Sequence, residues 1–129
     1  MAPTFNGISI VVADMAATLG FYRLLGLEFD TSDDAEGHVE CEGPGGVRLM
    51  FDTVSVVHSF DPDWHPPVGG PAMTLAFEVP EPAEVDTTVA NLLQAGHTAH
   101  REPWDAFWGQ RYATVLDPDG NRVDIFAWL

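Results

Sequence analysis

The sequence has very little positive charge. Against 20 Asp and Glu residues it has five basic residues, all of them arginine, and its formal net charge is −15. Nucleic acids and anionic membrane surfaces are bound through basic patches, so this charge argues against both as partners. A cationic or neutral small ligand is compatible with the charge, although solubility alone explains it equally well.

Cysteine and long apolar runs are also scarce. The single cysteine, Cys41, cannot form an internal disulfide, and the strand-like segment HVECE around it favours a buried, inert thiol over a reactive one. No apolar run approaches the roughly 18 residues of a membrane span. The first ten residues, MAPTFNGISI, lack the basic region of a signal peptide. We therefore expect a cytoplasmic protein without a membrane partner.

Two halves of the sequence repeat the same order of elements. In the first half, a strand rich in Ile and Val over residues 5–12 precedes a helix that begins at Met15. Asp14 is a suitable N-cap for this helix, and Gly26 follows its last turn. Three short strands are then expected, over residues 27–31, 37–42 and 46–52.

The second half has the same pattern. A strand over residues 73–79 precedes a helix that starts at Pro82 and ends at Gly96. Three strands follow near residues 98–102, 110–116 and 121–127, the last two joined by the turn DPDG. We therefore expect one α+β domain over residues 1–129, in which two βαβββ modules form curved mixed sheets around a cleft.

A connector separates the two modules, which cover about residues 1–52 and 72–129. The connector, residues 53–71, contains several prolines and glycines that predict an irregular path. It also carries Phe60, Trp64 and His65, and this aromatic content favours a functional loop over a passive linker.

Two motifs within this repeat carry a resemblance to a known family. They are D-x-x-x-(S/T)-x-x-F-Y-x-x-L-G, from Asp14 to Gly26, and DPDGN, from Asp117 to Asn121. With the duplicated βαβββ pattern, they resemble the vicinal oxygen chelate superfamily over essentially the whole chain. This superfamily includes glyoxalase I, extradiol dioxygenases, fosfomycin-modifying enzymes and bleomycin-binding proteins. The resemblance therefore implies a fold and leaves the function open.

Metal-dependent members of the superfamily hold a divalent ion with side chains from the first and last strand of each half. The internal repeat places the four matching positions at Gly7, Met50, Thr74 and Asp124. Only Asp124 is a donor that such a cation prefers, and no pair of the five histidines has the spacing of a metal site. We expect no metal, no other cofactor and no catalytic residue.

The segment from Pro103 to Tyr112 is the densest aromatic stretch of the chain. Flat aromatic faces in an apolar cleft are typical of sites for planar small molecules. Trp108, next to Gly109, is favoured as a ligand contact, whereas Trp104 is as well explained as a loop anchor. Arg111 fits an ion pair in so acidic a protein better than a ligand contact.

A narrower resemblance, to mitomycin-binding antibiotic resistance proteins, covers loops as well as strands. It rests on the segments GGVRLMFDTV, SFDPDW, PVGG and WGQRYATVLDPDGNRVDIFA. It implies a homodimer in which modules of two chains enclose two equivalent clefts. In those proteins a histidine and a tryptophan stack on either side of a planar drug, and the matching residues here are His38 and Trp108.

Together these observations predict a non-enzymatic protein that sequesters a planar antibiotic and confers self-resistance. The drug would be mitomycin-like or a peptide bearing a quinoxaline or quinaldate ring, stacked between His38 and Trp108. The other candidate ligand-binding residues are Phe51, Asp52, Phe60, Trp64, Phe107, Arg111 and Tyr112. Two alternatives remain open: a metal-dependent glyoxalase- or dioxygenase-type enzyme that uses Asp124 and His38, and a metal-free biosynthetic enzyme or carrier.

Overall fold

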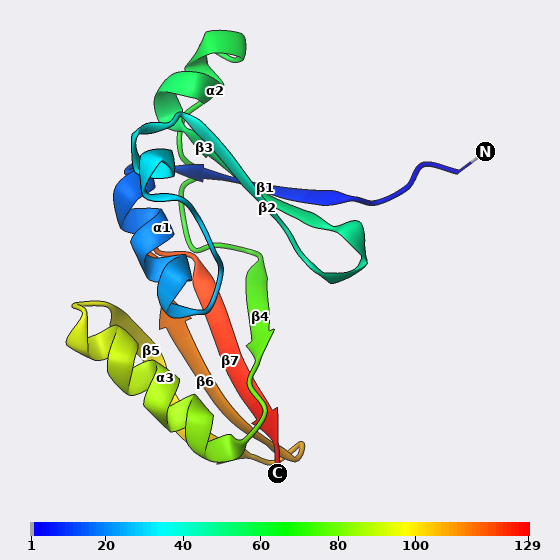
Figure 1. Cartoon of the computed structure of the whole chain (residues 1–129), viewed down its shortest axis with the longest axis vertical. Helices are drawn as coiled ribbons and strands as arrows, with labels where there is room; N and C mark the ends of the chain where they lie inside the picture. The colour runs from blue at the N-terminus through cyan, green and yellow to red at the C-terminus, as the bar shows by residue number, and fades with distance from the viewer. Residues whose placement is uncertain (1) are drawn as a thin grey trace. The chain divides into compact units, whose positions relative to one another are not determined.

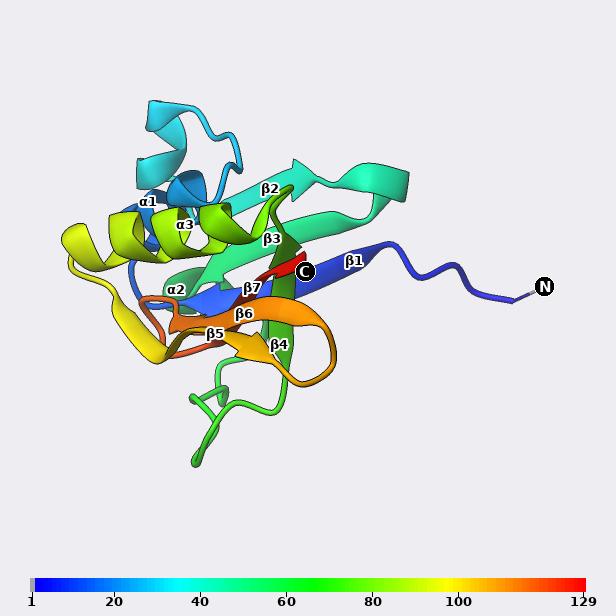
Figure 2. The same cartoon turned by 90° about the horizontal axis from the view of Figure 1, so that it is seen from below.

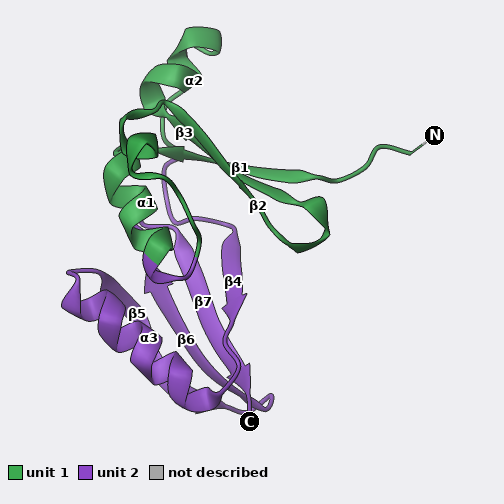
Figure 3. Cartoon of the chain, viewed as in Figure 1, with its two compact units in different colours: residues 1–23, 27–66 green, residues 24–26, 67–129 purple. Residues whose placement is uncertain are grey.

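The chain forms two compact units, each built on its own sheet. A computed structural model describes residues 2–129, which contain three α-helices and seven strands in two mixed sheets (Figure 1). Unit 1 is the chain up to Arg23 together with Leu27–Pro66, and unit 2 comprises Leu24–Gly26 and Pro67–Leu129 (Figure 3). None of the helices within the described residues is long and apolar enough to cross a membrane.

Unit 1 contains a three-stranded sheet in the order β1-β3-β2. Strand β1 (Gly7–Val12) runs parallel to β3 (Arg48–Thr53), and β2 (His38–Glu42) runs antiparallel to β3. Helix α1 (Met15–Leu24) follows β1, as the sequence predicts. Its N-cap is confirmed, because the Asp14 carboxylate accepts a hydrogen bond from the Ala17 amide at 3.1 Å.

The core of unit 1 lies between this sheet and α1. Phe51 of β3 and Tyr22 of α1 are completely buried, with ring centroids 5.2 Å apart, and Val39 of β2 is buried beside them at the register position opposite Phe51. Because successive side chains of a strand point to opposite faces, the neighbours of these residues in sequence lie on the face that α1 does not cover.

The strand predicted over residues 27–31 is absent. The segment instead leads into a short 3-10 helix, Thr31–Ala35, which begins with a capping box between Asp30 and Asp33. The Arg23 guanidinium donates to the carbonyls of Phe29 and Asp30, at 3.4 and 2.9 Å. These carbonyls are thus satisfied by a side chain from α1, and the segment does not join the sheet.

The predicted connector also differs from the expectation, because it begins with a helix. Helix α2 (Val54–Phe60) has Thr53 as its N-cap, and the Thr53 hydroxyl accepts a hydrogen bond from the Val56 amide at 3.3 Å. The helix packs against β3 and β1 and buries Val57. Only the rest of the connector is irregular, as predicted.

Unit 2 contains a four-stranded sheet in the order β4-β7-β6-β5. Strand β4 (Thr74–Glu78) runs parallel to β7 (Arg122–Trp128), whereas β6 (Gln110–Leu116) is antiparallel to both β7 and β5 (Thr98–Ala106). Helix α3 (Pro82–Gln94) lies along one face of the sheet (Figures 1 and 2). The sheet's core residues on that face, all completely buried, are Ala113, Val115, Val123, Ile125 and Ala127.

The strand register confirms the internal repeat. In both units the first strand pairs in parallel with the last, with Gly7 opposite Arg48 and Thr74 opposite Arg122. Two residues further along, Met50 and Asp124 occupy equivalent positions in β3 and β7. The sequence therefore placed these positions correctly.

Candidate functional site

An aromatic cluster covers the face of the unit 2 sheet that α3 leaves open. Tyr112 is central to it, since its cross-strand neighbours on β5 and β7 are Trp104 and Phe126. The Tyr112 and Phe126 rings stack at 6.2 Å, and Trp108, from the turn between β5 and β6, packs edge-on to Trp104 at 5.5 Å and to Tyr112 at 5.2 Å. We call Trp104, Trp108, Tyr112 and Phe126 the aromatic cluster. Each ring lies within contact distance of another, and such edge-to-face arrangements are favourable.

Strand β5 is longer than the strand predicted near residues 98–102, and it includes Trp104. It continues to Ala106, with two register irregularities, between Ala99 and Arg101 and between Arg101 and Trp104. Such bulges let a strand continue through a segment whose alternation is interrupted. The Arg101 guanidinium lies over the Trp104 ring, 3.9 Å from its centre. Trp104 is thus a packed member of the cluster.

Trp108 is the most accessible indole of the cluster and is held in place at its edge. Its Nε1 donates to Gln110 Oε1 at 2.7 Å, and the Phe107 ring packs edge-on against it at 4.9 Å. Gly109, with a φ of 94°, allows the tight turn that presents both rings. Trp108 keeps 45% of its surface exposed and Phe107 keeps 91%. A fixed and partly exposed indole of this kind is a ready stacking surface for a planar ligand.

A carboxylate lies beside the aromatic cluster. Asp124 of β7 accepts hydrogen bonds from the Tyr112 hydroxyl and, at 2.7 Å, from Thr114 Oγ1. Burial and then the hydrogen bond to Asp124 raise the pKa of Tyr112 to about 12. The phenol is therefore un-ionised at neutral pH and donates to Asp124.

Arg111 does not belong to this face. Its guanidinium bonds to Asp86 of α3 at 2.7 Å and to Asp105 at 3.2 Å, and the hydrogen bond to Asp86 raises its pKa. Arg111 directly precedes Tyr112 in β6, so its side chain points to the opposite, helix-covered side of the sheet. The ion pair that the sequence favoured is present, and we remove Arg111 from the candidate ligand contacts.

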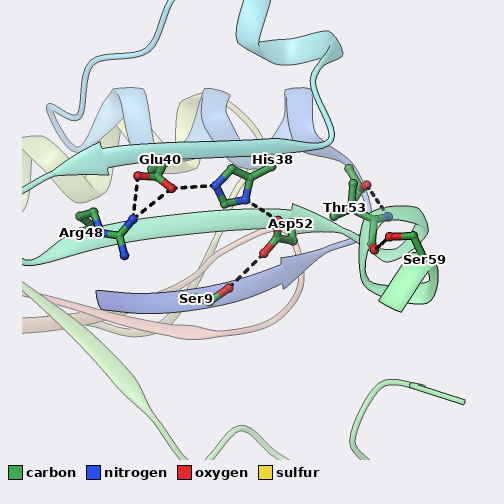
Figure 4. Close-up of polar contacts among 8 residues, drawn as sticks. Ser9, His38, Glu40, Arg48, Asp52, Thr53 and Ser59 are labelled. Atoms are coloured by element: carbon green, nitrogen blue, oxygen red, sulfur yellow. Dashed lines mark hydrogen bonds and ion pairs between the residues drawn. The ribbon is translucent and has the colours of Figure 1, made fainter. Parts of the chain in front are cut away.

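The open face of the unit 1 sheet carries a polar network centred on His38 (Figure 4). His38 Nδ1 lies 2.5 Å from Asp52 Oδ1, and Nε2 lies 2.8 Å from Glu40 Oε2. Glu40 accepts in turn from Arg48 at 3.0 Å, and Asp52 from Ser9 Oγ at 3.2 Å. The hydrogen bonds to Glu40 and Asp52 raise the pKa of His38, and the bond to His38 lowers the pKa of Glu40.

Residues 4–125 match the model of the Glyoxalase/Bleomycin resistance protein/Dioxygenase superfamily. The chain belongs to this superfamily. The superfamily holds both enzymes and non-enzymatic binders, so membership leaves the activity open. None of the curated proteins matches the sequence significantly.

Solved structures of the superfamily have the same fold. A glyoxalase/bleomycin resistance protein/dioxygenase family enzyme from Burkholderia phytofirmans PsJN has a TM-score of 0.82 and 21% identity, covering 98% of this chain and 100% of its own. A glyoxalase-related enzyme from Fulvimarina pelagi has a TM-score of 0.79 and 22% identity, covering 98% and 88%. A glyoxalase/bleomycin resistance protein/dioxygenase from Nocardioides has a TM-score of 0.71 and 26% identity, covering 100% and 85%.

The positions at which metal-dependent members of the superfamily hold a cation do not fit a divalent metal here. In unit 1, Gly7 has no donor, and a Cβ placed on it would lie 2.8 Å from the Met50 methyl group, so Met50 fills the space of a larger side chain. In unit 2, the carboxylate of Asp124 is already bonded to Tyr112 and Thr114. Among the described residues, no group of three or more His, Cys, Asp or Glu side chains is arranged to hold a metal ion.

Phe51 is also removed from the candidate ligand contacts. It is completely buried and packs against Tyr22 and Phe29, so its ring forms part of the core of unit 1. Asp52, the next residue of β3, points to the other face and joins His38. Because Phe51 and Asp52 are adjacent in β3, their side chains lie on opposite faces of the sheet and cannot both line one surface.

The two aromatic residues predicted in the connector both lie in unit 1. Phe60, the last residue of α2, is 71% exposed. The Trp64 ring lies 6.3 Å from the His58 ring, and the Trp64 carbonyl accepts a hydrogen bond from His58 Nε2 at 2.8 Å. The structure thus groups the predicted residues within units: His38 with Asp52 in unit 1, and Trp108 with Phe107 and Tyr112 in unit 2.

Several polar partners of these residues were not predicted from the sequence. Glu40 and Arg48 bond around His38, while Gln110 anchors Trp108. The patterns His-x-Glu in β2 and Arg-x-x-x-Asp in β3 could have indicated these partners. His38 and Glu40 share a face whenever residues 38–42 form a strand, and Arg48 and Asp52 do so whenever residues 48–53 form one.

Proposed function

We propose that this protein binds and sequesters a planar antibiotic without transforming it. The observation that carries the proposal is Trp108, an indole held at its edge by Gln110 and flanked by other rings, yet 45% exposed. A ligand that covers this ring gains stacking and removes apolar surface from water, while the protein loses little side-chain freedom because the ring is already fixed.

The second stacking residue in the proposal is His38, on the basis of the resemblance to mitomycin-binding resistance proteins. Its ring is fixed within the polar network of unit 1. Phe107, Tyr112, Asp52, Phe60 and Trp64 are proposed as further lining residues. The same resemblance leads us to propose a homodimer, and we further propose a cytoplasmic location.

Protection by sequestration makes demands on affinity and quantity. The protein has to be present in at least the same amount as the drug, and it has to retain the drug at low concentration. A Kd of about 1 μM corresponds to about −8 kcal/mol. Two stacking contacts of about 0.5–1.5 kcal/mol each, added to the burial of a planar ring system, make this affinity attainable.

A thermal-shift panel of mitomycins and of antibiotics with quinoxaline or quinaldate rings tests the proposal. A ligand that binds the folded state raises the melting temperature, and the stabilisation grows with the logarithm of its concentration relative to Kd. The panel should also include Zn²⁺, Mn²⁺ and Fe²⁺. Stabilisation by one of these metals at one equivalent, with none by any antibiotic, would favour the metal-dependent enzyme instead.

Trp108→Ala tests the site itself. We expect the affinity for the antibiotic found in the panel to fall at least about tenfold, equivalent to ~1.4 kcal/mol, because stacking and ring burial are both lost. Phe5→Ala is the control, since Phe5 is an exposed ring (71%) outside the proposed lining. Isothermal titration of both variants, with circular dichroism to verify the fold, gives the comparison. An unchanged Kd for Trp108→Ala contradicts the proposed site.

A further inference from the structure

Both ring nitrogens of His38 face carboxylates. Asp52 Oδ1 lies 2.5 Å from Nδ1, and Glu40 Oε2 lies 2.8 Å from Nε2. An ionised carboxylate can only accept hydrogen bonds, whereas a neutral imidazole has one donor and one acceptor nitrogen. Both contacts are therefore satisfied together only when His38 carries a proton on each nitrogen.

The two carboxylates are themselves held in place. Arg48 donates to both oxygens of Glu40, at 3.0 and 3.3 Å, and Ser9 donates to Asp52 at 3.2 Å. These contacts come from β1, β2 and β3, so the network extends across all three strands of the unit 1 sheet (Figure 4). Because Arg48 and Ser9 hold the two carboxylates in place, the carboxylates in turn fix the orientation of the His38 ring and favour its protonated form.

We propose that Glu40 and Asp52 are positioning residues that hold His38 as an imidazolium with both nitrogens occupied, so that it contacts its ligand through the ring face and favours electron-rich planar rings. This inference rests on the proposed function, in which His38 stacks on the ligand. The selectivity follows from charge. A cation is attracted to the negative face of an aromatic ring, and electron-donating substituents strengthen that attraction while electron-withdrawing ones weaken it.

The first test is made on the free protein and needs no ligand. Long-range ¹H–¹⁵N spectra of the histidine rings report which nitrogens carry protons. We expect both His38 nitrogens to be protonated at neutral pH, with a titration midpoint above the ordinary value of 6.5. The isosteric variants Glu40→Gln and Asp52→Asn should each lower this midpoint, because an amide can donate to a neutral imidazole nitrogen.

Glu42→Gln is the matched control. Glu42 lies on the same strand and, by the alternation of side chains, on the same face as Glu40, and its substitution removes the same charge. The midpoint should change far less in this variant than in Glu40→Gln. A wild-type His38 that is neutral at pH 7, or equal midpoints in Glu40→Gln and Glu42→Gln, overturns the positioning role.

The second test concerns ligand preference, with two bicyclic probes of similar size. We expect 6-methoxyquinoline to bind several-fold more tightly than 6-nitroquinoline, measured by chemical-shift changes of His38 and Trp108, and Glu40→Gln to reduce the difference. Equal or inverted affinities, or binding of neither probe at millimolar concentration, overturn the preference for electron-rich rings. Failure of the proposed function is seen separately, as unchanged antibiotic affinity in Trp108→Ala, and leaves the His38 titration standing.

Discussion

Phe51→Ala measures whether Phe51 belongs to the core or to a ligand-binding surface. The ring is completely buried and packs against Tyr22 at 5.2 Å and Phe29 at 5.9 Å. Replacing a buried Phe by Ala typically costs about 3–5 kcal/mol, from lost burial together with the cavity left behind. A domain has about 5–15 kcal/mol of stability in total, so the variant should lose a large part of it.

The expected change in melting temperature follows from the size of the protein. An unfolding entropy of about 2.1 cal/mol/K per residue, over 129 residues, gives about 0.27 kcal/mol/K. The predicted cost therefore lowers the melting temperature by about 11–18 °C. Differential scanning calorimetry or thermal unfolding followed by circular dichroism measures this, and a variant without cooperative unfolding counts as a larger loss.

Phe60→Ala is the control for this experiment. Phe60 is 71% exposed, so its removal should change the free energy of unfolding by no more than about 0.5 kcal/mol, or about 2 °C. If Phe51→Ala lowers the melting temperature by less than about 4 °C, equivalent to about 1 kcal/mol, the ring does not pack as the structure describes. A ligand-facing position would then have to be reconsidered.

Two further predictions concern the charged residues. The pKa of His38 is raised in the folded protein, so its contribution to stability is fully present below the unfolded value of 6.5 and is lost as pH rises through the folded pKa. Between about pH 6 and about pH 9, the urea concentration at the unfolding midpoint should therefore fall more in wild type than in His38→Gln. An equal fall in the two proteins would contradict the network. Arg111→Gln should cost less than about 1 kcal/mol, because its partners Asp86 and Asp105 are exposed, and should leave antibiotic affinity unchanged. A tenfold weaker Kd by isothermal titration would return Arg111 to the binding surface.

Much of the fold was predictable because both modules carry the same local sequence patterns. The helix signals at Asp14 and Pro82 and the apolar strands gave both modules their order, and the repeat gave the equivalence of Met50 with Asp124. These features depend on periodicity and capping, which act between residues close together in the sequence.

The errors in the fold arose where side-chain hydrogen bonds, caps and packing decide the conformation against the preference of the segment. The segment 27–31 has the composition of a strand, but Arg23 of α1 bonds to its carbonyls and the chain turns away into a 3-10 helix. The segment Val54–Phe60 is rich in β-branched residues, yet its packing on β1 and β3 and the cap at Thr53 make it a helix. Intrinsic preference is weak enough for such contacts to override it.

The sequence predicted which residue types form the candidate site, but not which side chains they contact. Aromatic density identified Trp108 and its neighbours, and the structure confirms that Trp108, Phe107 and Tyr112 contact one another. The assignments of Phe51 and Arg111 failed because residue chemistry was considered without the alternation of side chains along a strand. The contacts of Arg48 with Glu40 and of Asp52 with His38 depend on the register between β2 and β3, which the composition of either strand does not specify.

In each unit, the strand synthesised last is an interior strand of the sheet. β3 lies between β1 and β2, and β7 lies between β4 and β6. While unit 1 is being translated, β1 and β2 therefore have no paired neighbour until β3 is available. In unit 2, β5 and β6 can pair with each other, but β4 has no paired neighbour until β7 is available. β1 and β4 must wait longest, because each pairs with a strand more than 40 residues later in the chain. Contacts of such sequence separation slow folding, so each newly made unit passes through a period in which unpaired strands are exposed to aggregation or to chaperones.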